Sequence, residues 1–324
     1  MPPESPYLPV VGQAVDCCVE LWIQRGQNEH VLMIQETDKR TAKAKRLLNK
    51  VRGQGFSFGA NQADLDLLCV IHNGGDAGAK PGDPSFHAYA AALNAANDFA
   101  KPALDMPELV SFNNELADIR EEYLPSYPPL SPVTSALFAG WVVLDARDSI
   151  TGLTLGDLFL HHIQPAPRFE GLRQAMVALN GSFCSLYEVM EAGVDGVKLW
   201  DIAAQRELRC WNSSGYPGRR GEVWYTRVLP PFAPGSNRCV TISTPYVFGE
   251  GSRRAWEDFF QRRRASKGGI GQGLQDYLKY GERLGYWLEF VFQAFVGYTG
   301  NMIQVTGIPD DSASLPHSDA KHRL

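Results

Sequence analysis

Apolar side chains recur every three to four positions through most of the first 125 residues, a spacing that predicts amphipathic helices. The predicted helices cover residues 11–25, 28–52, 64–72, 85–100 and 107–123. Pro107 supports the last of them, because proline is tolerated in the first turn of a helix. A proline cluster then ends this region and predicts a domain boundary: Pro125, Pro128, Pro129 and Pro132.

The pattern changes to short apolar runs separated by turn residues between positions 184 and 248, which predicts strands. These runs are residues 185–191, 197–202, 207–212, 222–229 and 238–244. Their links at 192–196 and 203–206 are short enough for hairpins. Five short strands on short loops favour closure into a small antiparallel β-barrel or β-roll, because closure removes exposed strand edges.

Between the proline cluster and these strands, the continuous apolar run 137–145 (LFAGWVVLD) predicts a buried strand. Residues 154–162 form a predicted short helix in which Thr154 caps the first turn. The 3.6-residue pattern predicts one more helix at 168–179.

After the strands the pattern becomes helical again. Residues 253–264 and a long segment beginning near residue 274 are predicted helices, with a glycine-rich hinge at 268–273 between them. The long helix carries an apolar stripe that needs a partner surface, and we expect an unknown protein partner to bind it. The stripe consists of Leu274, Tyr277, Leu278, Leu284, Leu288, Val291, Phe292 and Phe295.

These patterns predict an α+β protein with a helical N-terminal region, a central small antiparallel β-barrel or β-roll, and a helical C-terminal region. The expected division is a helical domain at 1–125, a β-rich domain at 130–250 with the barrel at 184–248, and C-terminal helices at 251–305. The polar residues 306–324 are predicted to form a disordered tail.

Composition narrows the class of protein. The net charge of −5 over 324 residues argues against bulk electrostatic attachment to nucleic acid or to an anionic membrane, although it allows a local basic patch. The first residues lack the basic and apolar regions of a signal peptide, and the apolar run near the C-terminus is too short to span a bilayer. We therefore expect a cytoplasmic protein that does not bind membranes.

The six cysteines have no regular spacing, and no CxxC pair or Cys/His cluster occurs among them. This pattern predicts buried structural thiols, with neither a disulfide framework nor a metal site. The positions are Cys17, Cys18, Cys69, Cys184, Cys210 and Cys239.

A family resemblance spans about residues 138–248. It rests on Phe138-x-x-Trp141-x-x-x-Asp145, on Thr154-Leu155 leading to Phe159, on SLYEV at 185–189, on Leu199-x-Asp201-Ile202, and on GEVxxxRVLP at 221–230. This order resembles a module of uncharacterised bacterial proteins that often carry a SEC-C zinc motif. The resemblance implies an architecture and a bacterial, cytoplasmic setting. The cysteine cluster of the zinc motif is absent, so the resemblance implies no metal.

Two sets of residues suggest more specific functions. The first set is Asp145, Asp148, His161 and His162, whose side chains suit a divalent metal and would support a metal-dependent hydrolase. The alternative interpretation is structural, since acidic residues cap turns and histidines favour helix C-termini. Catalytic residues cannot be assigned, because no GxSxG elbow and no complete phosphate loop occurs.

The second set would bind single-stranded RNA or DNA by stacking bases on aromatic side chains within a positive groove of the barrel. It comprises Trp200, Arg209, Trp211, Arg219, Arg220, Trp224 and Arg227. Two further basic runs lie at 39–52 and 253–264. The alternative is that the tryptophans fill the barrel and the basic runs are solvated helix faces.

No strong catalytic motif accompanies the predicted barrel. The leading hypothesis is therefore a non-catalytic binding or interaction module without a cofactor. Nucleic-acid binding and metal-dependent hydrolysis remain the alternatives.

Overall fold

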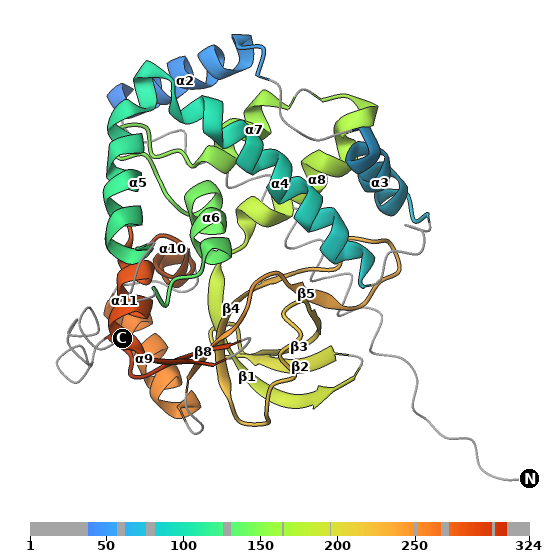
Figure 1. The fold of residues 1–324 in the computed structure, drawn as a ribbon, viewed down its shortest axis with the longest axis vertical. Coiled ribbons are helices and arrows are strands. Elements are labelled where there is room, and N and C mark those ends of the chain that lie inside the picture. The colour runs from blue at the N-terminus through green and yellow to red at the C-terminus, as the bar shows by residue number, and fades with distance from the viewer. Residues whose placement is uncertain are drawn as a thin grey trace, which may run out of the picture.

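The computed structural model describes residues 38–56, 62–75, 82–125, 131–163, 165–194, 196–248, 252–266, 272–299 and 302–309. Within these ranges the chain is an α+β protein with helices before and after a closed five-stranded barrel, which confirms the predicted fold class. Figure 1 shows the N-terminal helices gathered at one end, the barrel at the other, and the C-terminal helices along one side of both. The predicted helix 11–25 and almost all of the predicted tail lie outside the described residues.

The helical end is built around α4 (Pro84–Leu104), which lies against several other helices. The side chain of Asp83 caps α4 by accepting a 2.9 Å hydrogen bond from the Ser85 backbone N–H. Buried alanines such as Ala88, Ala92 and Ala96 let neighbouring helices approach closely. The other elements of the first 125 residues are α2 (Asp38–Gly53), α3 (Gln62–His72), the 3₁₀ turn Pro107–Leu109 and α5 (Val110–Tyr123).

Three more helices follow: α6 (Ser135–Leu144), α7 (Leu155–His162) and α8 (Glu170–Gly181). The prediction of a strand at 137–145 is wrong, because Thr134 caps a helix there by accepting a hydrogen bond from the Leu137 N–H. A helix that is apolar on every side reads as a continuous apolar run, as a buried strand does. The predicted Thr154 cap is confirmed, and Asp157 completes a capping box with it.

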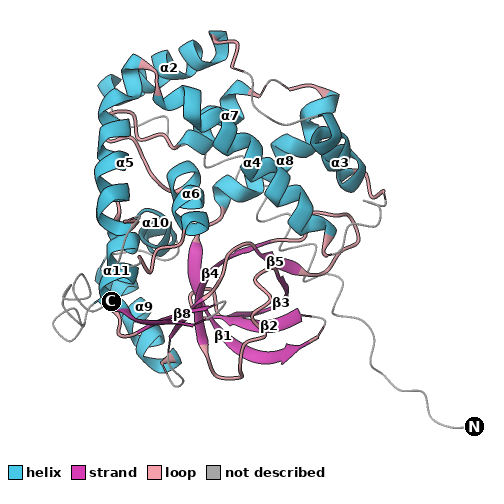
Figure 2. Ribbon diagram, in the orientation of Figure 1, coloured by secondary structure: helices cyan, strands magenta, loops and turns pink. Residues whose placement is uncertain are grey.

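The barrel comprises β1 (Cys184–Gly193), β2 (Gly196–Asp201), β3 (Arg206–Asn212), β4 (Val223–Leu229) and β5 (Cys239–Thr241). The first three strands form two hairpins, and β4 returns to pair with β1, which is Greek-key connectivity. β5 closes the barrel between β3 and β4 (Figure 2). It runs parallel to β3, so one of the barrel pairings is not antiparallel.

The barrel has its own interior, separate from the core it shares with the helices. Side chains that alternate along β1, β2 and β4 point inward, among them Val189, Leu199 and Trp224. The opposite side of β4, including Val223 and Tyr225, packs into the larger core with the helices. The barrel is therefore fixed to the helical layers through β4 and β1.

The C-terminal part contains β6 (Tyr246–Phe248), α9 (Arg253–Ser266), α10 (Gln272–Tyr280), α11 (Tyr286–Ala294), β7 (Phe295–Thr299) and β8 (Met302–Val305). The last two strands extend the sheet from β6. The single long helix predicted here is wrong, because the chain turns at Gly281 (φ 69°) and Gly285 (φ 77°) between α10 and α11.

The apolar stripe predicted to bind a partner protein is largely buried within the chain itself. Leu274, Leu278, Leu288 and Val291 are all part of the main core. None of the helices in the described ranges is long and apolar enough to cross a bilayer.

The turn at Gly281 yields a stability prediction. An alanine there would adopt a left-handed conformation, and its Cβ would lie 2.5 Å from the Cβ of Tyr286. We expect Gly281→Ala to lower the free energy of unfolding by about 2–3 kcal/mol. Gly53→Ala is the control, because a Cβ there meets nothing within 4 Å. Urea unfolding followed by tryptophan fluorescence measures both, and equal midpoints for the two variants would contradict the strain at Gly281.

Candidate functional site

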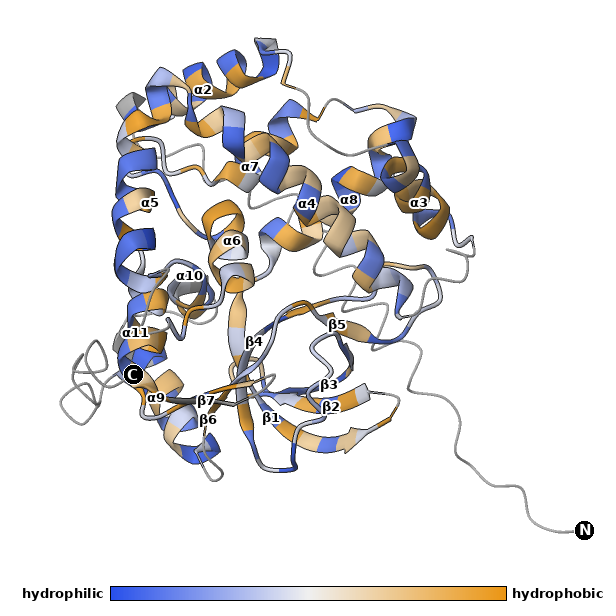
Figure 3. Cartoon of the chain, viewed as in Figure 1, coloured by the Kyte–Doolittle hydropathy of each residue, from blue (hydrophilic) through white to orange (hydrophobic). Residues whose placement is uncertain are grey.

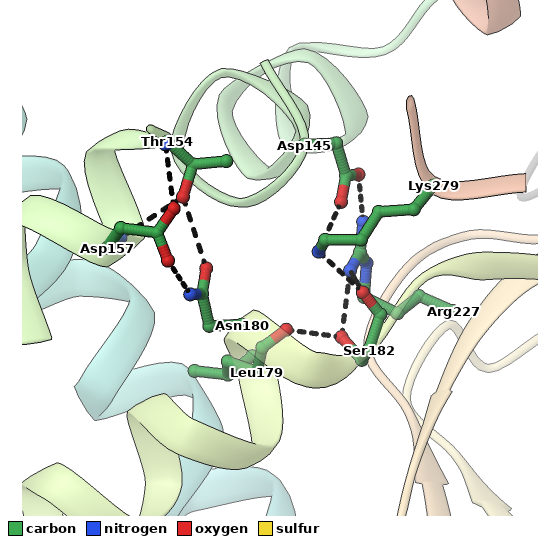
Figure 4. Close-up of polar contacts among 8 residues, drawn as sticks. All are labelled: Asp145, Thr154, Asp157, Leu179, Asn180, Ser182, Arg227 and Lys279. Atoms are coloured by element: carbon green, nitrogen blue, oxygen red, sulfur yellow. Dashed lines mark hydrogen bonds and ion pairs between the residues drawn. The ribbon is translucent and has the colours of Figure 1, made fainter. Parts of the chain in front are cut away.

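A buried charged cluster lies where the helices, the barrel and the C-terminal part meet (Figure 4). Asp145, directly after α6, forms ion pairs with Arg227 of β4 and with Lys279 of α10. The Lys279 Nζ lies 3.0 Å from Asp145 Oδ1. All three side chains are buried. We refer to Asp145, Arg227 and Lys279 as the junction cluster.

The backbone after α8 completes the junction cluster. The carbonyl oxygen of Ser182 accepts a 2.8 Å hydrogen bond from Lys279 and a 2.9 Å hydrogen bond from Arg227. Arg227 also donates to the Ser182 hydroxyl at 2.8 Å. That hydroxyl in turn donates to the Leu179 carbonyl, which holds the turn between α8 and β1. The carbonyl dipole thus helps to neutralise two cations that share one carboxylate.

The electrostatics of the junction cluster are uneven, because it contains two cations and one carboxylate. Burial lowers the pKa of Lys279 and the charge of Arg227 lowers it further, while Asp145 opposes both effects. Burial also raises the pKa of the neighbouring Cys184 thiol. Of the two cations, Lys279 is therefore the one that loses its charge more readily.

The space beside the junction cluster is too small for a substrate. Leu137, Trp141, Tyr225 and Trp287 enclose it, and it has room for about one water molecule. The Lys279 ammonium and the Asp145 carboxylate are engaged with each other and with Arg227 and Ser182. The geometry therefore suits a structural joint and leaves no reacting group directed at a ligand.

A second polar network lies beside the first (Figure 4). Asn180 of α8 donates a 2.6 Å hydrogen bond to Asp157, which caps α7 together with Thr154. Gly156 makes this contact possible, because a Cβ there would lie 2.5 Å from the Asn180 side-chain oxygen. This network fixes α7 against α8.

The four residues proposed as metal ligands have separate roles. Asp145 belongs to the junction cluster, and Asp148 accepts hydrogen bonds from the backbone and hydroxyl of Thr151 in its own turn. The ring nitrogens of His162 lie 3.2 Å from the carbonyl oxygens of Val51 and Phe56. Burial lowers the pKa of His161. Across the described ranges, no three His, Cys, Asp or Glu side chains form a group that could hold a metal.

The seven residues proposed to bind nucleic acid do not share a surface. Trp224 is 0% exposed inside the barrel and donates to Glu222, and Arg227 is 4% exposed in the junction cluster. Every residue of β4 is buried, so neither of these two side chains is presented on the barrel surface. The other five are partly or fully exposed: Trp200, Arg209, Trp211, Arg219 and Arg220.

The outer face of β2 and β3 is the exposed part of the barrel, and other groups of the chain partly cover and neutralise it. Arg253 lies over the Trp200 ring, 5.2 Å from its centroid, and pairs with Glu188. Lys198 lies 3.0 Å from Glu207 and 3.7 Å from Glu191. Trp211 contacts Phe86, with ring centroids 5.1 Å apart. The aromatic side chains here are thus engaged, and most of the cations have acidic partners.

Exposed positive charge is concentrated elsewhere, on α2. Six of its basic residues are exposed, and Asp38 is the only acid in the helix. They are Arg40, Lys43, Lys45, Arg46, Lys50 and Arg52. Lys50 pairs with Glu108 of the adjacent 3₁₀ turn. Figure 3 shows hydrophilic positions recurring along α2, and Figure 1 places the helix at the end of the molecule opposite the barrel.

Sequence reasoning had proposed Asp145 and Arg227 for two different functions and had not connected them. It missed Lys279 and Ser182 altogether. The sequence did contain one signal for Lys279. It is an isolated lysine next to Leu278 of the apolar stripe, and both residues lie on the buried side of the helix. Nothing in the chain order pairs it with Asp145, which lies 134 positions earlier.

No family model, curated protein or solved structure matches this chain. The resemblance to bacterial proteins with a SEC-C motif stays a prediction.

The uneven charge of the junction cluster predicts opposite results for two neighbouring substitutions. Asp145→Asn leaves two buried cations without a counter-charge, and we expect it to lower the free energy of unfolding by about 3–5 kcal/mol. Lys279→Met leaves the Arg227–Asp145 pair intact, and we expect a change within about 1 kcal/mol. Urea unfolding of both variants tests this, and a loss at Lys279→Met equal to that at Asp145→Asn would refute it.

The lowered pKa of Lys279 predicts a pH dependence. Between that lowered value and the ordinary pKa of 10.5, the unfolded chain binds more protons at this lysine than the folded chain. The free energy of unfolding contributed by Lys279 therefore rises with pH across this window. We expect the wild type to gain stability relative to Lys279→Met as the pH rises toward 10.5. A difference between the two proteins that falls over this range would show that the lysine pKa is not lowered.

Proposed function

We propose that the chain is a non-catalytic binding module that holds a nucleic acid by its phosphates through the exposed face of α2. The observation that carries this proposal is the concentration of exposed cations on one helix of a protein whose net charge is −5. Phosphate contacts need positive charge in an accessible array and no particular catalytic group.

Because α2 is anchored to the protein core, its exposed cations are held in a fixed arrangement. Leu47 and Val51 of α2 are buried in the main core, and the helix lies against α7. The cations therefore project on either side of an anchored stripe. Lys43, Arg46 and Lys50 share one flank, and from the helical rise they span about 10 Å. A single strand of duplex nucleic acid presents about three phosphates over that length.

The same anchoring argues against a membrane as the partner. A helix that lies in a bilayer interface inserts its apolar face among the lipids. In this chain the apolar face of α2 is already buried against the protein. A nucleic acid needs only the polar face, and we expect most of the contacts to go to phosphates, which carry no sequence information.

Two features of the core support a non-catalytic role: the engagement of polar side chains and the small size of the cavity beside the junction cluster. Asp145, Lys279 and His162 are each engaged with other protein groups. The cavity beside the junction cluster accepts about one water molecule.

Fluorescence anisotropy with single-stranded and duplex oligonucleotides at two salt concentrations tests the proposal. For the wild type we expect the logarithm of affinity to fall with the logarithm of salt concentration with a slope of about −3 to −5. The double variant Lys43→Gln/Arg46→Gln should bind at least about tenfold more weakly, and its slope should be shallower by about 2. These changes follow from losing two phosphate contacts.

The matched control is Arg219→Gln/Arg220→Gln, which removes the same charge from the exposed loop between β3 and β4. We expect it to retain the wild-type affinity and slope. Equal weakening in both double variants would contradict the proposal. It would mean that the nucleic acid binds elsewhere or that affinity depends only on the net charge of the protein. Binding to anionic vesicles but not to either oligonucleotide would overturn the choice of nucleic acid.

A further inference from the structure

Two thiols face each other where the barrel closes. Cys210 of β3 and Cys239 of β5 are directly paired residues in the parallel ladder between these strands, and both are free cysteines. Neighbouring strands lie about 4.8 Å apart, and paired residues point to the same side of a sheet. This separation falls within the range of about 4.4–6.8 Å between Cα atoms that a disulfide requires.

The two thiols differ in accessibility. Cys210 is 2% exposed inside the barrel, whereas Cys239 is half-buried and packs against the same interior cluster. Cys239 is therefore the more accessible of the two residues to a reagent in solution.

The surroundings also favour ionisation of Cys239. A hydrogen bond from Cys210 lowers the pKa of Cys239 and Arg206 lowers it further, while burial opposes both. Burial raises the pKa of Cys210. The accessible thiol is thus also the one that ionises more readily, which is the arrangement of an attacking and a resolving cysteine.

The other described cysteines lack this geometry. The Cys69 thiol donates to the Arg168 carbonyl at 3.5 Å, and Cys184 is buried beside the junction cluster. Neither is directly paired with another cysteine across the described strands.

We propose that Cys210 and Cys239 form a reversible thiol–disulfide site that reacts with a small organic disulfide such as oxidised glutathione. The Cys239 thiolate attacks one sulfur of the reagent, the reagent's S–S bond breaks, and one thiolate leaves and is protonated by water. Cys210 then loses its proton and attacks the Cys239 sulfur, which releases the second reagent thiol. Two protein thiols are oxidised to one disulfide, and the reagent is reduced to two thiols.

The bond would lock the pairing that closes the barrel. β5 has only three residues, and its parallel pairing with β3 completes the ring of strands. A covalent link here restrains the loop that carries β4, so the oxidised protein should unfold at a higher temperature. This inference concerns the barrel alone and does not depend on the proposed binding of nucleic acid by α2.

Peptide mapping of the full chain tests the proposal. Trypsin cleaves after Arg209 and Arg238, so the two cysteines begin the separate peptides 210–219 and 239–253. After treatment with oxidised glutathione and alkylation of the remaining thiols, we expect these peptides linked by a disulfide. After reduction, we expect both peptides alkylated. The oxidised protein should also melt about 5 °C higher than the reduced protein.

Single variants separate the two roles. Cys210→Ser should stop at a glutathione adduct on Cys239, and Cys239→Ser should leave Cys210 unmodified. Cys210→Ala serves as a second variant if the buried serine unfolds the barrel, and it should also stop at the adduct. Cys184→Ala is the control and should still form the linked peptide.

Three results would overturn the proposal. They are separately alkylated peptides after oxidation, a stable glutathione adduct on wild-type Cys239, and links to Cys69 or Cys184 in place of the 210–239 link.

Discussion

The carboxylate of Asp145 is shared by cations from two distant parts of the chain, and the arrangement of the molecule depends on it. Arg227 comes from the barrel and Lys279 from the C-terminal helices, while Asp145 itself ends a helix of the N-terminal layers. A buried cation without a counter-charge costs several kcal/mol, so neither cation can be accommodated unless Asp145 is in place. The helices, barrel and C-terminal part are therefore required to adopt their positions together.

This constraint separates the polar groups that hold the fold together from those that can meet a partner. The junction cluster and the neighbouring Asn180–Asp157 network use buried charges and amides to fix helices and strands. Lys198 of β2 and Arg253 of α9, which lies over the barrel, are paired with glutamates. Most of the exposed cations of α2 lie outside such pairs in the described residues, and the helix is at the end of the molecule far from the barrel (Figure 1).

Local patterns predicted most of the helices and the barrel strands, because caps, turns and apolar periodicity act over a few residues. They failed at residues 137–145, where an all-apolar helix has no period to distinguish it from a strand. They also failed in β4, whose residues are buried on both faces, so that no alternation showed where Trp224 and Arg227 point. The junction cluster required contacts between residues 145, 182, 227 and 279, which only the tertiary fold brings together. The Cys210–Cys239 pairing was hidden for the same reason, since β5 joins β3 through a parallel contact that hairpin signals do not encode.

Native-state hydrogen exchange most directly tests whether the junction cluster makes the chain one cooperative unit. The amides to compare are the slowest-exchanging ones in α4 of the helical end, β4 of the barrel and α11 of the C-terminal part, which are the three parts that the cluster joins. We expect these amides to exchange with one common free energy of opening, equal to that of global unfolding, and to respond equally to low concentrations of denaturant. Barrel amides that stay protected while the helical amides exchange would contradict this account.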